Sequence, residues 1–486
     1  MQLEKLLSDI TYTNIYNLQD IDIAGIAYDS RLCKDNYIFV ANKGTATDGN
    51  FYISNAIAAG AKVVVCENMP ESADANTMAN GITYITTTNP RITLAELAHS
   101  FYNNPTSKLK LIGITGTNGK TTTTFLVKSI LEAAGKQVGI IGTTGIYINQ
   151  RKIEATHTTP ESLELAQIFS EMVAEGIEYV VMEVSSHSIA MHRIHGIEFN
   201  VAGFTNLTHE HLDFHKTMDD YANTKQQLFT NLNKTAVAIV NADDEYATKM
   251  VAKCPAIIKT FGIDTSADYR IDDVHIDMKH TTFTLNKNPI TTQLTAYFNV
   301  QNATLAIAIC IELGFTWSAV SQGIAMSKGA AGRLELVAVK SGATAYVDYA
   351  HTPDALEKSL ITCRELIDER NGGKLICIFG CGGDRDKTKR PIMGAIAVKY
   401  ADVVIVTDDN PRTEESTSII NDILVGINDS DNVQVINNRS DAIAHSIAIS
   451  KKDDVILVAG KGHEDYQIIG TTKHHFSDVE ELQKHL

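Results

Sequence analysis

A glycine-rich loop lies between an apolar run and a threonine-rich segment. Residues Leu111–Thr124 read LIGITGTNGKTTTT, an order that predicts a strand, a tight loop and then a helix. Glycines let backbone N–H groups converge on phosphate oxygens, and the helix N-terminus adds the positive end of its dipole. Lys120 would neutralise the β- and γ-phosphates, and the Thr121 or Thr122 hydroxyl would reach Mg²⁺. The candidate ATP-binding residues are Gly116, Thr117, Asn118, Gly119, Lys120, Thr121 and Thr122.

The loop departs in one position from the general phosphate-loop pattern. That pattern has a glycine five residues before Gly119, where this chain has Ile114. The alternative interpretation is an ordinary turn between a strand and a capped helix. A lysine and a threonine directly after Gly119, with a strand in front of the loop, favour nucleotide binding.

Acidic, histidine and lysine residues follow later strands. Glu183 ends the apolar run Tyr179–Val184, where it could hold Mg²⁺ or cap the next turn. The segment His209–His215 has three histidines and two acids in seven residues. It fits either a metal site or a polar loop with one hydrogen-bonded histidine. The spacing does not resolve which histidine matters, and Lys225 reads as a solvated residue on a helix.

Length and composition limit the class of protein. A chain of 486 residues exceeds the ~250–300 residues at which single cores stop growing. The net charge of −16 argues against binding to nucleic acid or an anionic membrane. Seven cysteines without a C-x-x-C pair indicate buried thiols in a reducing compartment. Without a signal core or a bilayer-spanning apolar run, we expect a soluble, cytoplasmic protein.

Alternating β-branched runs and helical patterns predict α/β domains with mainly parallel sheets. We expect a small N-terminal α/β domain over residues 1–103, a central phosphate-loop domain over 104–330 and a C-terminal Rossmann-like domain over 331–486. In the last domain, three predicted strands run into loops at 380–383, 408–411 and 460–462. Ligands of open parallel sheets bind at the carboxyl ends of strands, so these loops predict a binding site.

Together the motifs resemble the Mur ligase family, in order over nearly the whole chain. Within it they resemble the members that add the third residue of the peptidoglycan stem peptide. The segments that carry the resemblance are Tyr28–Arg31, Thr45–Gly49, Thr115–Thr122, His157–Glu161, Glu183–His187, Asn206–His215, Asp348–Asp354, Gly380–Asp386, Asp409–Arg412 and Gly460–Glu464.

The resemblance implies an ATP- and Mg²⁺-dependent ligase that acts as a monomer. It would join meso-diaminopimelate to UDP-N-acetylmuramoyl-L-Ala-D-Glu through an acyl phosphate. Glu183 and Thr121 would hold one Mg²⁺, while Lys225, as a carbamate, would hold a second with His211. Lys120, Lys225 and His211 would be the catalytic residues. Further contacts with the nucleotide would come from Asn302, Arg333, Asp348 and His351.

The resemblance also assigns the two other substrate sites. The UDP-dipeptide would contact Tyr28, Ser30, Thr45, Ala46, Thr47, His157, Thr158, Thr159, Ser185, Met191 and Arg193. Met191 stands where the family often has glutamine, and His157 where it often has asparagine. The amino-acid pocket would use Arg385, Asp409, Asn410, Pro411, Arg412, Gly460 and Glu464.

Arg412 bears on the choice of amino acid. A guanidinium can grip the distal carboxylate of diaminopimelate with two parallel hydrogen bonds, and the Asp-Asn-Pro-Arg form is associated with diaminopimelate-adding members. Lysine has no such carboxylate. The alternative interpretation of Arg412 is a surface ion pair after a turn proline.

Four rival functions differ in what they predict. A lysine-adding variant of the ligase would take L-lysine instead. A folylpolyglutamate synthase would also join a glutamyl carboxylate to an amine, but the N-terminal block and Asp409–Arg412 argue against it. A phosphate-loop switch ATPase would hydrolyse ATP without an acceptor. A non-catalytic ATP sensor is disfavoured because so many charged site positions are present.

Overall fold

The protein is described here from a computed structural model that covers residues 1–44, 47–70, 81–263, 266–277, 280–368, 372–428 and 431–485. It divides into two compact units, Met1–Arg270 with Leu305–Val320, and Ile271–Thr304 with Ser321–Leu486. Within the described residues, no helix has the length and apolar character needed to cross a membrane. All seven cysteines are free thiols, and six of them are buried, as expected.

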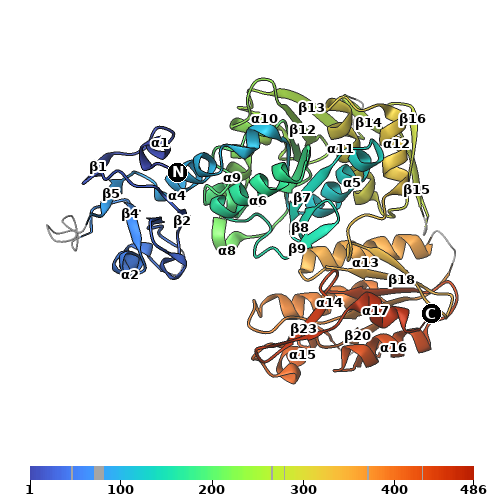
Figure 1. Ribbon diagram of the computed structural model, residues 1–486. Coiled ribbons are helices and arrows are strands. Elements are labelled where there is room, and N and C mark those ends of the chain that lie inside the picture. Colours follow the sequence, from blue (N-terminus) through green and yellow to red (C-terminus); the bar gives the residue numbers. More distant parts are fainter. Residues whose placement is uncertain are drawn as a thin grey trace. The chain divides into compact units, whose positions relative to one another are not determined.

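The first unit begins with a small sheet of order β1-β5-β4-β3-β2, drawn in blue in Figure 1. Strands β2 to β5 are parallel, and β1 pairs with β5 in the antiparallel sense. The strands are β1 Asn14–Tyr16, β2 Gly25–Ala27, β3 Tyr37–Val40, β4 Ala61–Cys66 and β5 Thr83–Thr86. The helices are α1 Leu3–Leu7, α2 Ile53–Ala58 and α4 Pro90–Phe101, with 3-10 turns at Ser30–Leu32, Gly49–Tyr52 and Pro105–Lys108.

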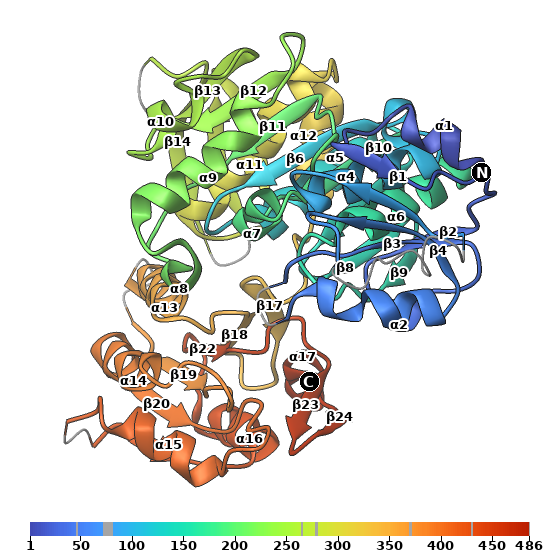
Figure 2. The same cartoon turned by 90° about the vertical axis from the view of Figure 1, so that its left-hand side faces the viewer.

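A larger sheet follows, with the order β14-β13-β12-β11-β6-β10-β7-β8-β9. Strand β6 lies in its middle, parallel to both β10 and β11 (Figure 2). The strands are β6 Lys110–Thr115, β7 Val138–Gly142, β8 Gly145–Ile148, β9 Arg151–Ile153, β10 Tyr179–Glu183, β11 Val201–Phe204, β12 Val237–Asn241, β13 Ile257–Gly262 and β14 Tyr269–Ile276. Glu183 pairs with Ile114, and Phe204 with Thr115. The loops after β6, β10 and β11 therefore meet at one edge.

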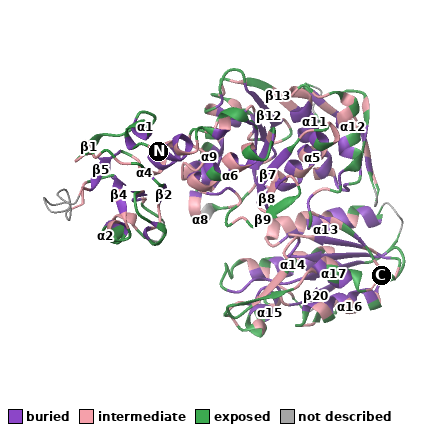
Figure 3. Cartoon of the chain, viewed as in Figure 1, coloured by how far each residue is buried: buried purple, intermediate pink, exposed green. Residues whose placement is uncertain are grey.

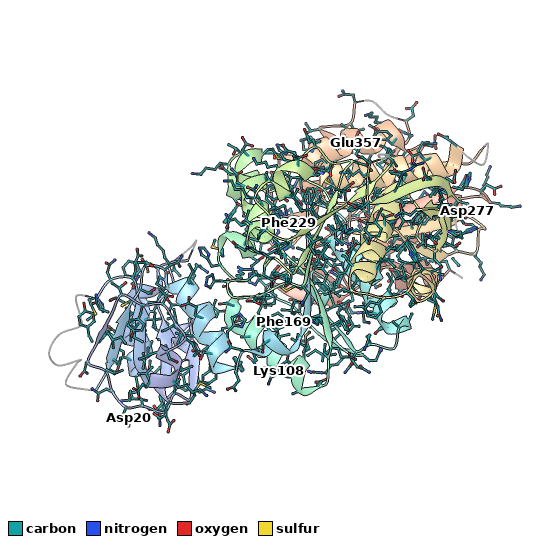
Figure 4. The ribbon with its side chains drawn as sticks, turned by 90° about the horizontal axis from the view of Figure 1, so that it is seen from above. Asp20, Lys108, Phe169, Phe229, Asp277 and Glu357 are labelled. Atoms are coloured by element: carbon teal, nitrogen blue, oxygen red, sulfur yellow. The ribbon has the colours of Figure 1, made fainter. Side chains whose placement is uncertain are left out.

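Helices cover both faces of this sheet. On one face Phe169 of α6 and Phe229 of α9 belong to a single core cluster and are fully buried (Figure 4). On the other, α5 contacts β6, β7 and β10. The helices are α5 Lys120–Ala133, α6 Ser162–Ala174, α7 Ser186–Ala190, α8 Leu212–His215, α9 Met218–Thr230, α10 Ala247–Val251, α11 Tyr297–Glu312 and α12 Trp317–Met326.

The second unit contains a sheet of order β17-β18-β22-β19-β20-β21, parallel except for β17. All residues of β19 and β22 are buried (Figure 3). Strands β15 Thr281–Leu285 and β16 Asn288–Thr292 are antiparallel and extend the larger sheet beyond β14, so that within the described residues this sheet has eleven strands. The sheet strands are β17 Glu335–Ala338, β18 Thr344–Asp348, β19 Leu375–Phe379, β20 Val403–Val406, β21 Val433–Val435 and β22 Val455–Ala459.

Two helical layers enclose the second-unit sheet. Residues of α13, α14 and α15 share one core cluster with the strands, and residues of α16 and α17 share the other. These helices are α13 Pro353–Asp368, α14 Lys389–Tyr400, α15 Ser416–Leu424, α16 Arg439–Ile449 and α17 Asp478–Gln483. Strands β23 Tyr466–Ile469 and β24 Thr472–His475 form a hairpin. The predicted α/β class with mainly parallel sheets is confirmed, whereas the domain boundaries after residues 103 and 330 stay predictions.

Candidate active site

The loop between β6 and α5 requires its glycines. Gly116 has φ +146° and Gly119 has φ +86°, conformations that residues with a side chain rarely adopt. A Cβ atom on Gly116 would lie 1.9 Å from the Thr205 hydroxyl oxygen. Gly119, the N-cap of α5, has no side chain to bond the first amides of the helix. The N-cap therefore makes no side-chain hydrogen bond at this helix start, where the helix dipole favours an anion such as phosphate.

The end of β11 holds this loop in place. The Thr117 amide donates to the Asn206 carbonyl oxygen at 2.8 Å, and the Asn118 amide donates to Asn206 Oδ1 at 2.9 Å. The Thr205 hydroxyl donates to the Asn118 carbonyl at 2.6 Å. Asn206 therefore shapes the loop, a role that its place after a strand did not reveal.

Glu183 is a buried carboxylate beside the start of α5. It accepts hydrogen bonds from the Thr121 hydroxyl at 2.9 Å and from the Thr143 amide at 2.9 Å. It therefore supports the turn after β7 and also contacts the loop threonine. Within the described residues, no group of three or more His, Cys, Asp or Glu side chains could hold a metal ion. A hydroxyl and one carboxylate still fit Mg²⁺, because this ion commonly binds one or two carboxylates, waters and substrate phosphates.

Lys225 is 1% exposed on α9, so the interpretation of a solvated lysine is wrong. Its Nζ donates to the Gly116 carbonyl at 2.9 Å and to the Thr115 hydroxyl at 3.4 Å. Burial, and then the neighbouring charge of Lys120, hold the pKa of Lys225 well below its ordinary value. The apolar residues around it on α9 are compatible with a buried helix face, and only the fold shows that Lys225 shares it.

The structure distinguishes the histidines after β11. His215 is buried, and its Nε2 lies 2.8 Å from the Ser186 hydroxyl. His211 has φ +57°, and its Nε2 lies 3.6 Å from Glu210 Oε2. The hydrogen-bonded structural histidine is therefore His215, and His211 is half-exposed.

Tyr221 connects His211 to the phosphate loop. Its ring centroid lies 4.7 Å from Lys225 Nζ and 6.1 Å from the His211 ring. Its hydroxyl lies 3.2 Å from the Thr117 hydroxyl. Lys225 and His211, assigned to the same metal, thus contact one side chain.

A cavity of about 540 Å³ adjoins this cluster. Its wall includes seven residues assigned to the acceptor or the metal, which are His157, Thr158, Thr159, Ser185, Met191, Arg193 and His211. Thr143 connects the wall to Glu183, because its hydroxyl lies 3.1 Å from the Thr158 hydroxyl and 3.2 Å from Glu183 Oε2. A chain of hydrogen bonds from Thr121 through Glu183 and Thr143 to Thr158 therefore connects the phosphate loop to the lining of this cavity.

A second cavity, of about 590 Å³, lies at the small sheet. Tyr28, Ser30 and Thr47 line it as predicted, together with Asn42 and Asn55, which sequence reasoning missed. Thr45 and Ala46 lie outside the described residues.

Three residues, Gly44, Arg91 and Glu161, line both cavities. Glu161 Oε1 lies 2.8 Å from Arg193 Nε, and Glu161 Oε2 lies 3.6 Å from Arg91 Nη1. Arg91 is thus a candidate contact that no motif indicated, and one elongated ligand could pass from one cavity to the other.

In the second unit, three predicted nucleotide contacts gather at the end of β18. The Arg333 guanidinium lies 4.8 Å from the Tyr349 ring centroid. Asp348 accepts from the Leu334 amide at 2.6 Å, and its pKa is raised by burial although Arg333 opposes this. His351 Nδ1 lies 2.8 Å from the Tyr349 carbonyl, and burial lowers the pKa of this imidazole. Asn302 lies buried on α11, where it donates to Asn299 Oδ1 at 3.1 Å.

The loops after β20 and β22 bring Asn410 and Glu464 together. Asn410 Nδ2 donates to Glu464 Oε2 at 2.9 Å, and the Ile468 amide donates to Asn410 Oδ1 at 2.9 Å. Lys461 Nζ lies within 3.1–3.6 Å of Asp409, Asn410 and Glu464. Lys461 and the β23–β24 hairpin are contributors that sequence reasoning did not identify.

Arg412 adopts φ +53° directly after Pro411. Its amide donates to the Ile468 carbonyl at 3.0 Å, and its Nη1 donates to the Gly383 carbonyl at 2.9 Å. Strained conformations of this kind concentrate at binding sites. The described guanidinium contacts are to carbonyl oxygens, so the surface ion pair considered above is not formed. Arg385 lies exposed on the loop after β19, and Gly460, with φ +120°, follows β22.

Comparisons with known proteins match all three regions of the chain. Family models described as the Mur ligase family catalytic domain, the Mur ligase middle domain and the Mur ligase glutamate ligase domain match residues 22–102, 114–310 and 332–462. A UDP-N-acetylmuramoyl-L-alanyl-D-glutamate–2,6-diaminopimelate ligase of Clostridium tetani is 44% identical over 100% of this chain and 99% of its own length. The chain belongs to the Mur ligase family.

Other relatives and solved structures agree with this membership. A ligase of the same name from Phocaeicola vulgatus is 41% identical over 99% of both chains. A solved structure of such a ligase aligns with a TM-score of 0.68 at 30% identity, covering 95% of this chain and 94% of that one. Mycobacterium tuberculosis folylpolyglutamate synthase shares the fold, with a TM-score of 0.63 at 19% identity over 76% of this Mur ligase and 92% of the synthase.

Replacing Gly116 with alanine tests the loop geometry. The new Cβ would meet Thr205 and force a strained φ, which costs about 1–3 kcal/mol. We expect the affinity for ATP, measured by titration calorimetry with Mg²⁺, to fall at least about tenfold. Gly135→Ala is the control, because Gly135 has φ +76° after the same helix but no atom lies within 4 Å of its Cβ position. An equal loss in both variants would contradict the role of the loop.

Proposed function

We propose that this Mur ligase joins meso-diaminopimelate to the D-glutamyl carboxylate of UDP-N-acetylmuramoyl-L-Ala-D-Glu, releasing ADP and phosphate. The observation that carries the proposal is a chain of hydrogen bonds that connects the phosphate loop to the 540 Å³ cavity of the first unit. The Thr121 and Thr143 hydroxyls both donate to Glu183, and the Thr143 hydroxyl is also hydrogen-bonded to the hydroxyl of Thr158, which lines the cavity. A carboxylate in the cavity would therefore lie next to the γ-phosphate.

The reaction proceeds in two displacements. A carboxylate oxygen attacks the γ-phosphorus, the bond from this phosphorus to the bridging oxygen breaks, and ADP leaves an acyl phosphate. The amine then attacks the acyl carbon, the bond from this carbon to the phosphate oxygen breaks, and phosphate leaves as the amine loses a proton. Lys120, at the start of α5, balances charge on the transferring phosphoryl oxygens.

Residues of the first unit would hold Mg²⁺ beside this path. The Thr121 hydroxyl and the Glu183 carboxylate would hold one ion, and His211 with a carbamate on Lys225 would hold another. The bound ions supply positive charge to the phosphoryl oxygens. The chain's own part is to keep Glu183 buried and hydrogen-bonded at the start of α5.

The buried environment of Lys225 supports its modification. An uncharged amine can attack carbon dioxide, whereupon a nitrogen–carbon bond forms and the amine loses a proton. Because burial and Lys120 lower the pKa of Lys225, the uncharged form is favoured at lower pH than for an exposed lysine. Carbamate formation should therefore increase as the pH rises through that lowered pKa.

Labelled bicarbonate tests the carbamate on Lys225. After incubation with ¹³C-bicarbonate, we expect one protein carbamate signal in the NMR spectrum, whose intensity increases with pH. Lys225→Gln should remove the signal and reduce ligase turnover at least about 100-fold, since an anionic metal ligand is lost. Lys249→Gln, at a partly exposed lysine paired with Asp219, is the control and should keep both. Full turnover of Lys225→Gln would refute this role.

The amino-acid pocket supports diaminopimelate over lysine. Glu464 offers a carboxylate to an ammonium group, and Arg412 lies on the adjoining loop with its Nη1 bonded only to carbonyl oxygens in the described contacts. A substrate with both an ammonium and a carboxylate at its distal end would pair with both Glu464 and Arg412. We also propose that the enzyme acts as a cytoplasmic monomer.

Release of ADP in the presence of different amines tests the function. With UDP-N-acetylmuramoyl-L-Ala-D-Glu present, kcat/KM for meso-diaminopimelate should exceed that for L-lysine at least about 100-fold. The reason is that L-lysine has no distal carboxylate to pair with the Arg412 guanidinium. Omitting the UDP-dipeptide should abolish release. Preference for L-lysine would identify the lysine-adding variant, and ADP release without any acceptor would favour a switch ATPase.

A further inference from the structure

The turn after β22 contains a fully buried lysine, Lys461. Its side chain is 0% exposed, and it lies between two glycines with positive φ, Gly460 at +120° and Gly462 at +53°. A buried ammonium costs free energy unless it is paired and hydrogen-bonded. The partners of Lys461 therefore explain why it is there.

Lys461 contacts three residues of the proposed amino-acid pocket. Its Nζ donates to Asn410 Oδ1 at 3.1 Å and lies 3.3 Å from Asp409 Oδ1 and 3.6 Å from Glu464 Oε2. Asp409 and Asn410 follow β20, whereas Glu464 follows β22. Because Lys461 is buried beneath these side chains, it acts on a substrate through them.

These contacts determine which way the Asn410 amide points. Its Oδ1 accepts from two donors, Lys461 Nζ and the Ile468 amide. The reverse orientation would set the NH₂ group against both donors. The observed orientation directs Nδ2 to Glu464 Oε2 at 2.9 Å, and so it locates the Glu464 carboxylate.

Lys461 also places a cation beside two carboxyl groups. These belong to Asp409 and Glu464. Burial raises the pKa of Glu464, Lys461 lowers it, and Asp409 raises it. Among the described residues, the titratable or charged groups that interact with this cluster include Tyr466, Tyr349, Arg439, His351, Asp408 and Cys381.

We propose that Lys461 is a positioning residue for the amino-acid substrate. It orients Asn410 and lies 3.6 Å from Glu464 Oε2, so that the pocket presents one located carboxylate to the ammonium group of the incoming amino acid. This inference rests on the proposed function. A lysine that merely stabilised the loop by pairing with Asp409 would affect all substrates and the fold alike.

Steady-state ADP release by the full chain distinguishes these roles. We expect Lys461→Met, which keeps the length without the charge, to raise KM for meso-diaminopimelate about tenfold or more. KM for ATP and for the UDP-dipeptide should stay unchanged. The acid limb of kcat/KM for diaminopimelate should move to higher pH, because Glu464 loses the cation that lowers its pKa. Lys461→Arg should restore most of the affinity and the original limb.

Two further variants keep the test decisive. Lys399→Met, at an exposed lysine paired with Glu357, should behave like wild type. If Lys461→Met does not fold, Lys461→Gln retains a donor for Asn410 without the charge, and its acid limb should still move. An unchanged limb and an unchanged KM for diaminopimelate, or an equal rise in all three KM values, overturns the inference. Failure of the wild-type protein to turn over diaminopimelate would instead reject the proposed function.

Discussion

Two lysine side chains donate to the same carbonyl oxygen, that of Gly116. Lys120 Nζ lies 2.9 Å from it at the start of α5, and Lys225 Nζ lies 2.9 Å from it on α9. Two ammonium groups this close repel each other, and together with burial this lowers the pKa of Lys225 well below its ordinary value. One peptide unit thus positions both lysine side chains, Lys120 at the start of the helix and Lys225 buried behind the loop.

That arrangement depends on how three parallel strands end. The loops after β6, β10 and β11 meet at one sheet edge, and each supplies a part, respectively the phosphate loop, Glu183 and Asn206. The positive φ of Gly116 lets its carbonyl face both lysines without a Cβ in the way of Thr205. The proposed acceptor cavity is connected to this edge by the hydrogen bond between Thr143 and Thr158. The proposed nucleotide, acceptor and metal sites therefore depend on one strand order.

Much of this could be read from local patterns. The order strand, glycine loop, lysine, threonine, helix is a local signature, and so is a polar loop after a buried strand, which led to Glu183 and Asn410. The predictions that failed or stayed open concern residues whose surroundings come from segments distant in the sequence. Lys225 reads as a surface residue because its burial comes from packing against β6, and His215 rather than His211 proved structural because Ser186 lies beside it. Arg91 carries no motif, and Glu161 and Lys461 lie inside motif segments without being singled out, because only the fold pairs Arg91 with Glu161 and Lys461 with Asp409.

The central claim is that the acceptor carboxylate attacks the γ-phosphate. It is tested most directly by labelling both oxygens of the D-glutamyl carboxylate with ¹⁸O and analysing the released phosphate by mass spectrometry. The two displacements predict that each turnover transfers one labelled oxygen to inorganic phosphate and leaves the other in the new amide. Phosphate released without label, while the amide forms at the normal rate, would contradict the account.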